Sequence, residues 1–166
     1  MVPLHCLTKG TNKMTKNEEL SRAIKIAVEA HENQWRWNGT PYIIHPINVM
    51  NKVKTPDEKI IAILHDVLED SKFTEDQLLN AGLDQRNVMI LGFYLTRTKD
   101  IEYTNYIQNI YNGNCSEAVN VKLADLEDNL NLLSPNNIGG KYLTEYRISS
   151  RNNMHSFEVK YWFASY

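Results

Sequence analysis

The sequence predicts an all-α fold, a single helical bundle, from three observations. Apolar residues recur at helical spacing along most of the chain. Capping residues, prolines and glycines mark the ends of these periodic segments. No segment shows the polar and apolar alternation of a convincing strand. A chain of 166 residues suits one domain with its own core, which we place at residues 17–166, after a leader at 1–16 that has no apolar period.

The first half of the chain is expected to form helices over residues 17–31, 43–54, 56–68 and 74–82. Asn17 is a possible N-cap of the first helix, and Pro56 suits the first turn of the third, where its missing N–H is tolerated. This third helix is apolar nearly all round, so we expect it at the centre of the fold. Thr74 and Gln77 form a capping-box pattern. Residues 33–42 contain Asn, Gly and Pro and predict a loop.

The second half is expected to form helices over residues 84–96, 101–111 and 116–133, followed by a break at 135–140. A last helix is expected to carry the aromatic residues Tyr142, Tyr146, Phe157, Tyr161, Trp162 and Phe163. The aromatic residues near the end of the chain would either close the core or make a contact in a homo-oligomer, and the pattern leaves both open.

The composition excludes several classes of protein. A formal net charge of -2 argues against a general nucleic-acid binder, which needs clustered positive charge. No stretch approaches the roughly 20 apolar residues of a membrane span. The two cysteines, Cys6 and Cys115, cannot form a disulfide framework. We expect a cytoplasmic protein that binds neither nucleic acid nor membrane.

Four ionisable residues lie at the end of the otherwise apolar third helix and directly after it: His65, Asp66, Glu69 and Asp70. Burying such groups without partners would cost several kcal/mol per ion. Helical geometry places His65 beside Glu69 and Asp66 beside Asp70. Imidazole and carboxylate groups together suit manganese, iron, cobalt or zinc. The alternative is a helix end that simply carries its charges into solvent.

Two other predicted helices supply matching residues. His45 directly precedes Pro46, and Asp125 lies in an apolar run with Asn129 one turn later. Taken alone, a histidine in this position is more often structural, and an aspartate on a helix is usually solvated. Together with the third helix, however, they complete a set of possible metal ligands.

The pattern of one His, a His-Asp pair about twenty residues later and a distant Asp resembles the HD superfamily of metal-dependent phosphohydrolases. Three segments narrow the resemblance: AHENQWRWNGTPYIIHP at 30–46, LHDVLEDS at 64–71 and VKLAD at 121–125. They resemble the hydrolase domain of RelA/SpoT-type alarmone enzymes and their small stand-alone relatives. The match runs from about residue 19 to residue 131. The resemblance implies a single HD-domain helical bundle.

The resemblance also implies roles for individual residues. The expected ligands of one divalent metal ion, with manganese the first expectation, are His45, His65, Asp66 and Asp125. Glu69 and Asp70 match the acidic pair that positions and deprotonates the attacking water. The residues implied to bind substrate are Arg36 on the base, Asn129 near the nucleoside and Lys99 on a phosphate. Tyr42 packs beside the first metal ligand in the family pattern.

The chain departs from the family pattern at three positions. Trp37 stands where the family usually has a lysine, and Glu127 and Asp128 stand where relatives carry neutral or basic residues. If these two acids face the pocket, they remove positive charge that a pyrophosphate group needs. Trp37 would add a second stacking surface for a base.

Three functions follow as hypotheses. The first is removal of the 3′-pyrophosphate from guanosine tetra- or pentaphosphate by a stand-alone, manganese-dependent hydrolase. The second keeps the site but acts on the 2′-phosphate of NADPH or on another nucleotide phosphate. The third is a nucleotide-binding or partner-binding module without catalysis, against which the complete ligand set argues. A small-molecule nucleotide is the expected partner.

Overall fold

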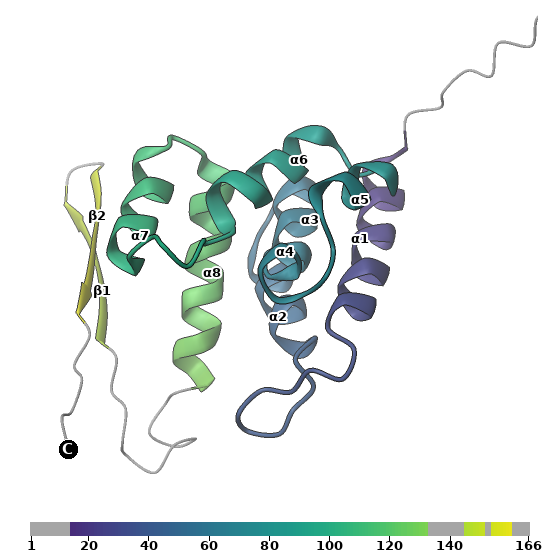
Figure 1. Ribbon diagram of the computed structural model, residues 1–166. Coiled ribbons are helices and arrows are strands. Elements are labelled where there is room, and N and C mark those ends of the chain that lie inside the picture. Colours follow the sequence, from purple (N-terminus) through teal and green to yellow (C-terminus); the bar gives the residue numbers. More distant parts are fainter. Residues whose placement is uncertain (1–13, 133–144, 152–153, 161–166) are drawn as a thin grey trace, which may run out of the picture.

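The computed structural model describes residues 14–132, 145–151 and 154–160. Helices form most of this part of the chain, and two strands pair as a hairpin (Figure 1). The elements are α1 (Lys16–Ala30), α2 (Ile44–Lys52), α3 (Pro56–Leu64), α4 (Val67–Asp70), α5 (Glu75–Asn80), α6 (Gln85–Ile90), η1 (Leu91–Leu95), α7 (Tyr103–Asn112), α8 (Ser116–Leu132), β1 (Glu145–Arg151) and β2 (Met154–Lys160). The expected break at 135–140, most of the expected leader and the aromatic residues Tyr142, Tyr161, Trp162 and Phe163 lie outside the described residues. None of the described helices combines the length and apolar character needed to cross a membrane.

The centre of the bundle is α3, as its sequence predicts. Its apolar residues from Ile60 to Leu64 have no exposed surface. α1, α2 and α8 pack against it, so it is covered on several sides (Figure 1). Because the end of α3 leads directly into His65 and Asp66, the core of the fold places His65 in a buried position and Asp66 in a half-buried one. The all-α prediction is confirmed for the bundle that positions the site.

Capping residues define where several helices begin. Thr74 accepts a hydrogen bond from the backbone of Gln77, and the Gln77 side chain accepts one in return, which confirms the predicted capping box. The predicted cap of α1 is wrong. Thr15 is the N-cap, and it forms a capping box with Glu18, so the helix begins at Lys16 and Asn17 lies within its first turn. Threonine with glutamate three residues later satisfies two backbone donors at once.

The predicted helix over 56–68 is interrupted at His65 and Asp66, which separate α3 from α4. The physical reason is competition for one carbonyl group. The Nδ1 atom of His65 lies 2.8 Å from the Ala62 carbonyl oxygen, and the His65 backbone N–H also points to that oxygen at 3.5 Å. This carbonyl would otherwise accept from the N–H of Asp66. The interruption turns consecutive side chains toward the same site.

The predicted helix over 84–96 also divides, into α6 and the π-helical turn η1. η1 ends where Thr96 becomes extended, and the Thr96 hydroxyl donates to the Leu91 carbonyl at 3.0 Å. Single π-helical turns often occur beside functional sites. Here η1 places Leu95 and, two residues later, Arg97 at the pocket described below.

The prediction of a last helix is wrong for the described residues, because β1 and β2 form an antiparallel hairpin there. Tyr146 is paired with Val159, and Ile148 with Phe157. Aromatic and β-branched residues at every second position favour a strand over a helix. This alternation was present in the sequence, but the wider spacing of aromatic residues obscured it.

Candidate metal centre

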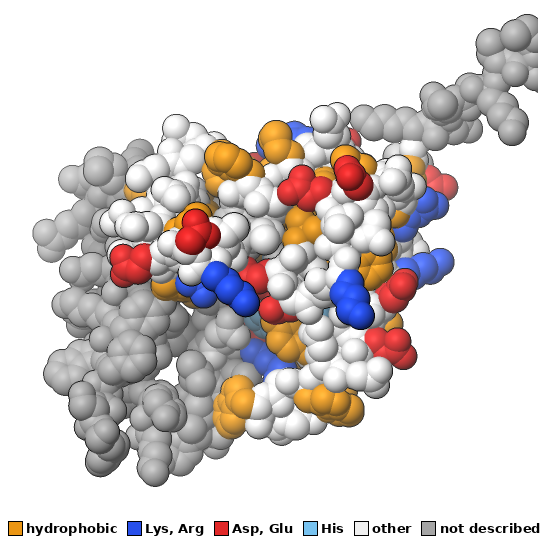
Figure 2. All heavy atoms as spheres, viewed as in Figure 1, with side chains coloured by type: hydrophobic (Ala, Val, Ile, Leu, Met, Phe, Trp, Pro, Cys, Tyr) orange, Lys and Arg blue, Asp and Glu red, His pale blue; other side chains and the backbone are white. Residues whose placement is uncertain are grey.

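A pocket of about 270 Å³ opens at the middle of the face shown in Figure 2, where acidic and basic side chains gather. α2, the α3–α4 junction, η1, α7 and α8 contribute to its wall. The lining residues are Tyr42, His45, His65, Asp66, Glu69, Leu95, Arg97, Tyr103, Tyr106, Val121, Lys122, Asp125, Leu126 and Asn129. Three elements distant in sequence thus bring the predicted metal ligands into one cavity.

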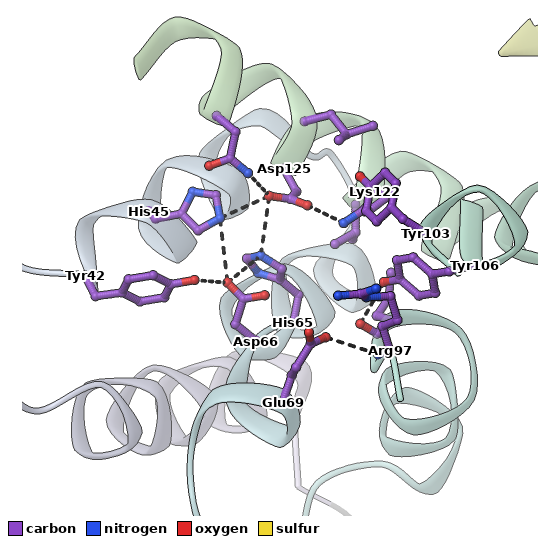
Figure 3. A pocket seen from close by; sticks show the side chains of 14 residues that line it. Tyr42, His45, His65, Asp66, Glu69, Arg97, Tyr103, Tyr106, Lys122 and Asp125 are labelled. Carbon is purple, nitrogen blue, oxygen red and sulfur yellow. Dashed lines mark hydrogen bonds and ion pairs between the residues drawn. The ribbon is translucent and has the colours of Figure 1, made fainter. Parts of the chain in front are cut away.

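Two imidazole nitrogens and two carboxylate oxygens converge at the base of this pocket (Figure 3). His45 Nε2 lies 3.1 Å from Asp125 Oδ1 and 3.7 Å from Asp66 Oδ2. His65 Nε2 lies 3.0 Å from Asp66 Oδ2 and 3.8 Å from Asp125 Oδ1. Ligand atoms about 2.1 Å from one cation and at right angles to each other are about 3 Å apart. The observed separations suit a common cation.

The histidine rings are oriented for metal binding. His65 Nδ1 donates to the Ala62 carbonyl oxygen, which leaves the lone pair of Nε2 facing Asp66 and Asp125. His65 Nε2 is buried and forms no hydrogen bond with a described residue, and Asp66 Oδ2 lies 3.0 Å from it. Once this buried nitrogen has given up its proton, its lone pair lies beside two carboxylates, which fits a divalent cation. His45, His65 and Asp125 form a buried group that can hold a metal ion.

The charges at the base of the pocket depend on one another. Burial would lower the pKa of His65, but Asp66 and Asp125 outweigh burial and raise it to about 9. Burial would raise the pKa of both aspartates, but hydrogen bonds and nearby positive charge hold each below its ordinary value. The carboxylates therefore attract a proton to His65 when nothing else neutralises them. A divalent cation would take the place of that proton.

Neighbouring side chains hold the two carboxylates in position. The Tyr42 hydroxyl donates to Asp66 Oδ2 at 2.6 Å, and burial together with Asp66 raises the pKa of this tyrosine, so it remains a donor. Asn129 Nδ2 donates to Asp125 Oδ1 at 2.7 Å, and Lys122 Nζ donates to Asp125 Oδ2 at 2.7 Å. Such second contacts fix the direction in which a ligand oxygen points.

The acidic pair predicted to handle water lies on α4, next to the ligands. Glu69 lines the pocket, and its Oε2 accepts from the backbone N–H of Arg97 at 3.1 Å. Asp70 Oδ2 lies 3.4 Å from the Tyr42 hydroxyl, and its backbone carbonyl accepts from Gln34 at 2.8 Å. Burial and the nearby Asp66 raise the pKa of Asp70, which favours its accepting a proton.

The residues predicted to bind substrate fall in different places. Asn129 lines the pocket, while Lys99 is exposed and is not among the lining residues. Arg36 has a side chain only 8% exposed, and it donates to Asp128 at 2.9 Å and to Asn129 at 3.1 Å. Trp37 is 57% exposed and does not line the pocket.

Four other lining residues had no role predicted from the sequence, and one of them, Lys122, contacts the predicted ligand Asp125 (Figure 3). These are Arg97, Tyr103, Tyr106 and Lys122. The guanidinium of Arg97 lies over the Tyr103 ring, 5.9 Å from its centroid, and Lys122 Nζ lies 5.3 Å from the centroid of Tyr106. Lys122 was detectable, because it precedes Asp125 by three residues on a helix. Arg97 was not detectable, because it follows a π-helical turn and the spacing of apolar residues in the sequence does not predict such a turn.

The two acids that depart from the family pattern, Glu127 and Asp128, do not face the pocket. The Glu127 side chain is 64% exposed and lies 3.5 Å from Lys52. Asp128 is buried beneath the site, where Arg36 and His45 contact its carboxylate. The condition under which these two acids would remove positive charge needed by a pyrophosphate group, that they face the pocket, is therefore not met.

Known proteins give an independent comparison. No family model matches the chain. A guanosine-3′,5′-bis(diphosphate) 3′-pyrophosphohydrolase of Borreliella burgdorferi is 30% identical over 142 residues, which cover 76% of this chain and 21% of the relative. The enzyme of the same name from Aquifex aeolicus is 46% identical over 65 residues, covering 37% of this chain and 9% of the relative. A solved structure reported as a metazoan ortholog of SpoT that hydrolyses ppGpp matches with a TM-score of 0.60 and 26% identity, covering 69% of this chain and 70% of the other.

The resemblance to RelA/SpoT-type hydrolases is confirmed. The matched segments span only 8–21% of the length of the first three curated relatives, whereas the metazoan SpoT ortholog is covered over most of its length. The likeness to the curated RelA/SpoT-type proteins therefore concerns only a part of their length. In the structure of this chain the side chains of His45, His65, Asp66 and Asp125 lie together.

Proposed function

We propose that this protein is a metal-dependent phosphohydrolase that acts on a nucleotide, with removal of the 3′-pyrophosphate from guanosine tetraphosphate as its reaction. The observation that carries the proposal is the convergence of two histidines and two aspartates at the base of a pocket. The names of the relatives support the choice of substrate. His45, His65, Asp66 and Asp125 would hold the ion, with manganese as the proposed metal.

The residues around the ligands can have different roles in hydrolysis. A bound divalent cation supplies Lewis acidity, which polarises a phosphoryl oxygen and lowers the pKa of water. Asp70, with its raised pKa, is the group we assign to accept the proton of the attacking water, and Glu69 orients that water from the pocket wall. Water adds to the phosphorus that carries the 3′-oxygen as the bond between these two atoms breaks, and the 3′-oxygen takes up a proton from solvent, giving GDP and pyrophosphate.

The far side of the pocket suits the negative charge of the substrate. Lys122 is already paired with Asp125, but within the described part of the chain no carboxylate forms an ion pair with the Arg97 guanidinium. Its Nη1 atom donates to the Ile101 carbonyl at 3.3 Å, which holds the group at the pocket while leaving other N–H donors for a phosphate. A pocket with acids at one end and an arginine at the other fits a polyphosphate ester.

Replacing Arg97 by glutamine should raise KM for guanosine tetraphosphate by about 10-fold to 100-fold, the size of a lost charge-assisted hydrogen bond. The turnover number should change much less, because the ligands are untouched. Lys99→Gln removes the same charge from the exposed side chain two residues away and is the matched comparison. A larger effect at Lys99 than at Arg97 would return the phosphate contact to Lys99, where the family pattern places it.

A panel of nucleotides tests the substrate. Purified protein with manganese is given guanosine tetraphosphate, NADPH and GTP, and the release of phosphate and pyrophosphate is measured for each. Pyrophosphate release from the tetraphosphate at the highest kcat/KM supports the proposal. Phosphate release from NADPH alone would keep the metal chemistry and replace the substrate, and inactivity on all three would contradict the hydrolase.

A further inference from the structure

Asp128 connects three segments of the chain beneath the pocket. It lies one helical turn after Asp125 on α8. Its Oδ2 atom accepts from His45 Nδ1 on α2 at 2.8 Å and from Arg36 Nη1 in the loop before α2 at 2.9 Å. The side chains of Asp128 and Arg36 are each 8% exposed, and that of His45 is 3% exposed. A single carboxylate oxygen thus receives both donors away from solvent.

The contact with Asp128 determines which nitrogen His45 presents to the pocket. When Nδ1 carries the proton and donates to a carboxylate, Nε2 keeps its lone pair. His45 Nε2 then faces Asp125 Oδ1 at 3.1 Å and Asp66 Oδ2 at 3.7 Å. A carboxylate behind a histidine also makes the imidazole a more basic ligand and prevents the ring from rotating.

Arg36 contacts both Asp128 and Asn129. A buried carboxylate needs a compensating charge, and the Arg36 guanidinium supplies it to Asp128. The other arm of the guanidinium, Nη2, donates to Asn129 Oδ1 at 3.1 Å. Asn129 in turn donates to Asp125 Oδ1 at 2.7 Å. The planar fork of one arginine is therefore linked to two predicted ligands, His45 through Asp128 and Asp125 through Asn129.

We propose that Asp128 and Arg36 are positioning residues for the metal centre: Asp128 orients His45, and Arg36 fixes the positions of Asp128 and Asn129. The inference rests on the proposed metal site and adds a role that the family resemblance does not give to either residue. It also gives a physical reason for an acid at position 128, which the sequence interpretation treated as a loss of positive charge. In this role Arg36 increases the affinity of the site for the metal ion, and this effect is separate from any contact of Arg36 with the base of a nucleotide.

Metal affinity is the direct test, and Glu127 provides the matched control. Manganese binding is measured by calorimetry for the parent chain and for Asp128→Asn, Asp128→Ala, Arg36→Gln and Glu127→Gln. Asp128→Ala should weaken binding by about 10-fold to 100-fold, and Asp128→Asn and Arg36→Gln by about 10-fold. Glu127→Gln removes the neighbouring charge from an exposed side chain and should change affinity less than about twofold. Asp128→Asn combined with Arg36→Gln should cost less than the product of the single effects.

Two further measurements separate positioning from folding. Saturating manganese should restore the turnover number of Asp128→Asn, because the reacting groups are intact, while general damage to the fold would not be restored. In the zinc-loaded parent, ¹⁵N spectra of the histidines should show His45 protonated at Nδ1, a result that needs no variant. Parent-like affinity in all Asp128 and Arg36 variants, or His45 protonated at Nε2, would overturn the inference. If the parent chain itself binds no metal, the proposed function falls with it.

Discussion

Replacing Asp66 by asparagine is expected to weaken manganese binding by about 100-fold, because one ligand of a four-residue site contributes on the order of 3 kcal/mol. The value of kcat/KM should fall by about 10³-fold, since the cation stabilises several kcal/mol of developing charge. The substitution keeps the shape of the side chain and an oxygen that can accept from Tyr42. Calorimetry and pyrophosphate release measure the two effects.

Thermal unfolding of the same variant gives a reading that is independent of activity. Manganese at about 100 times its Kd should stabilise the parent by about 2.7 kcal/mol and raise its Tm by roughly 5–10 °C. The Asp66→Asn protein should show little of this rise. Asp76→Asn, a change at an exposed acid on α5, is the control and should behave like the parent. An Asp66→Asn protein with parent-like metal affinity would remove Asp66 from the site.

Changing Asp70 to asparagine should lower kcat by about 10²-fold to 10⁴-fold, the usual contribution of a general base, while leaving manganese affinity within a few-fold of the parent. Asp70 lies next to the predicted ligands, but its carboxylate is not one of the groups that converge with the two imidazoles. Steady-state kinetics at saturating manganese isolates this effect. KM should change little, because Asp70 Oδ2 lies beside the Tyr42 hydroxyl near the ligands, and not beside Arg97, which is proposed to bind the phosphate groups.

Glu69→Gln provides the comparison that assigns roles within the acidic pair. Glu69 lines the pocket and accepts from the Arg97 backbone, so its replacement should lower kcat and also disturb KM. Glu32→Gln, at an exposed acid beyond α1, should alter neither constant. If Glu69→Gln has the larger effect on kcat and Asp70→Asn is nearly silent, the proton acceptor is Glu69.

The fold was predictable where one local signal dominates. The apolar run from Ile60 to Leu64 identified the central helix, and Thr74 with Gln77 marked the start of α5. The interruption after Leu64 was not predictable from periodicity, because it depends on the His65 side chain competing for a backbone carbonyl. The hairpin formed by β1 and β2 was missed because aromatic residues at irregular spacing were assigned to one helix.

In the site, too, residues marked by a local pattern were predictable, and side-chain directions set by tertiary packing were not. His65 and Asp66 stood out because ionisable residues interrupt an apolar helix, and the family pattern linked them to His45 and Asp125. The sequence alone could not show that Asp128 turns inward while Glu127 turns outward, since both are acids on one helix. Their directions depend on how α8 packs against α2 and on the buried Arg36.

The most direct test of the central claim is a titration of the metal-free protein with manganese while pyrophosphate release from guanosine tetraphosphate is measured. We expect no activity in chelator and a rise in activity that saturates at one equivalent of manganese per chain, with Asp66→Asn inactive at that point. Full activity in the presence of a strong chelator, or no activity at any manganese concentration, would contradict it.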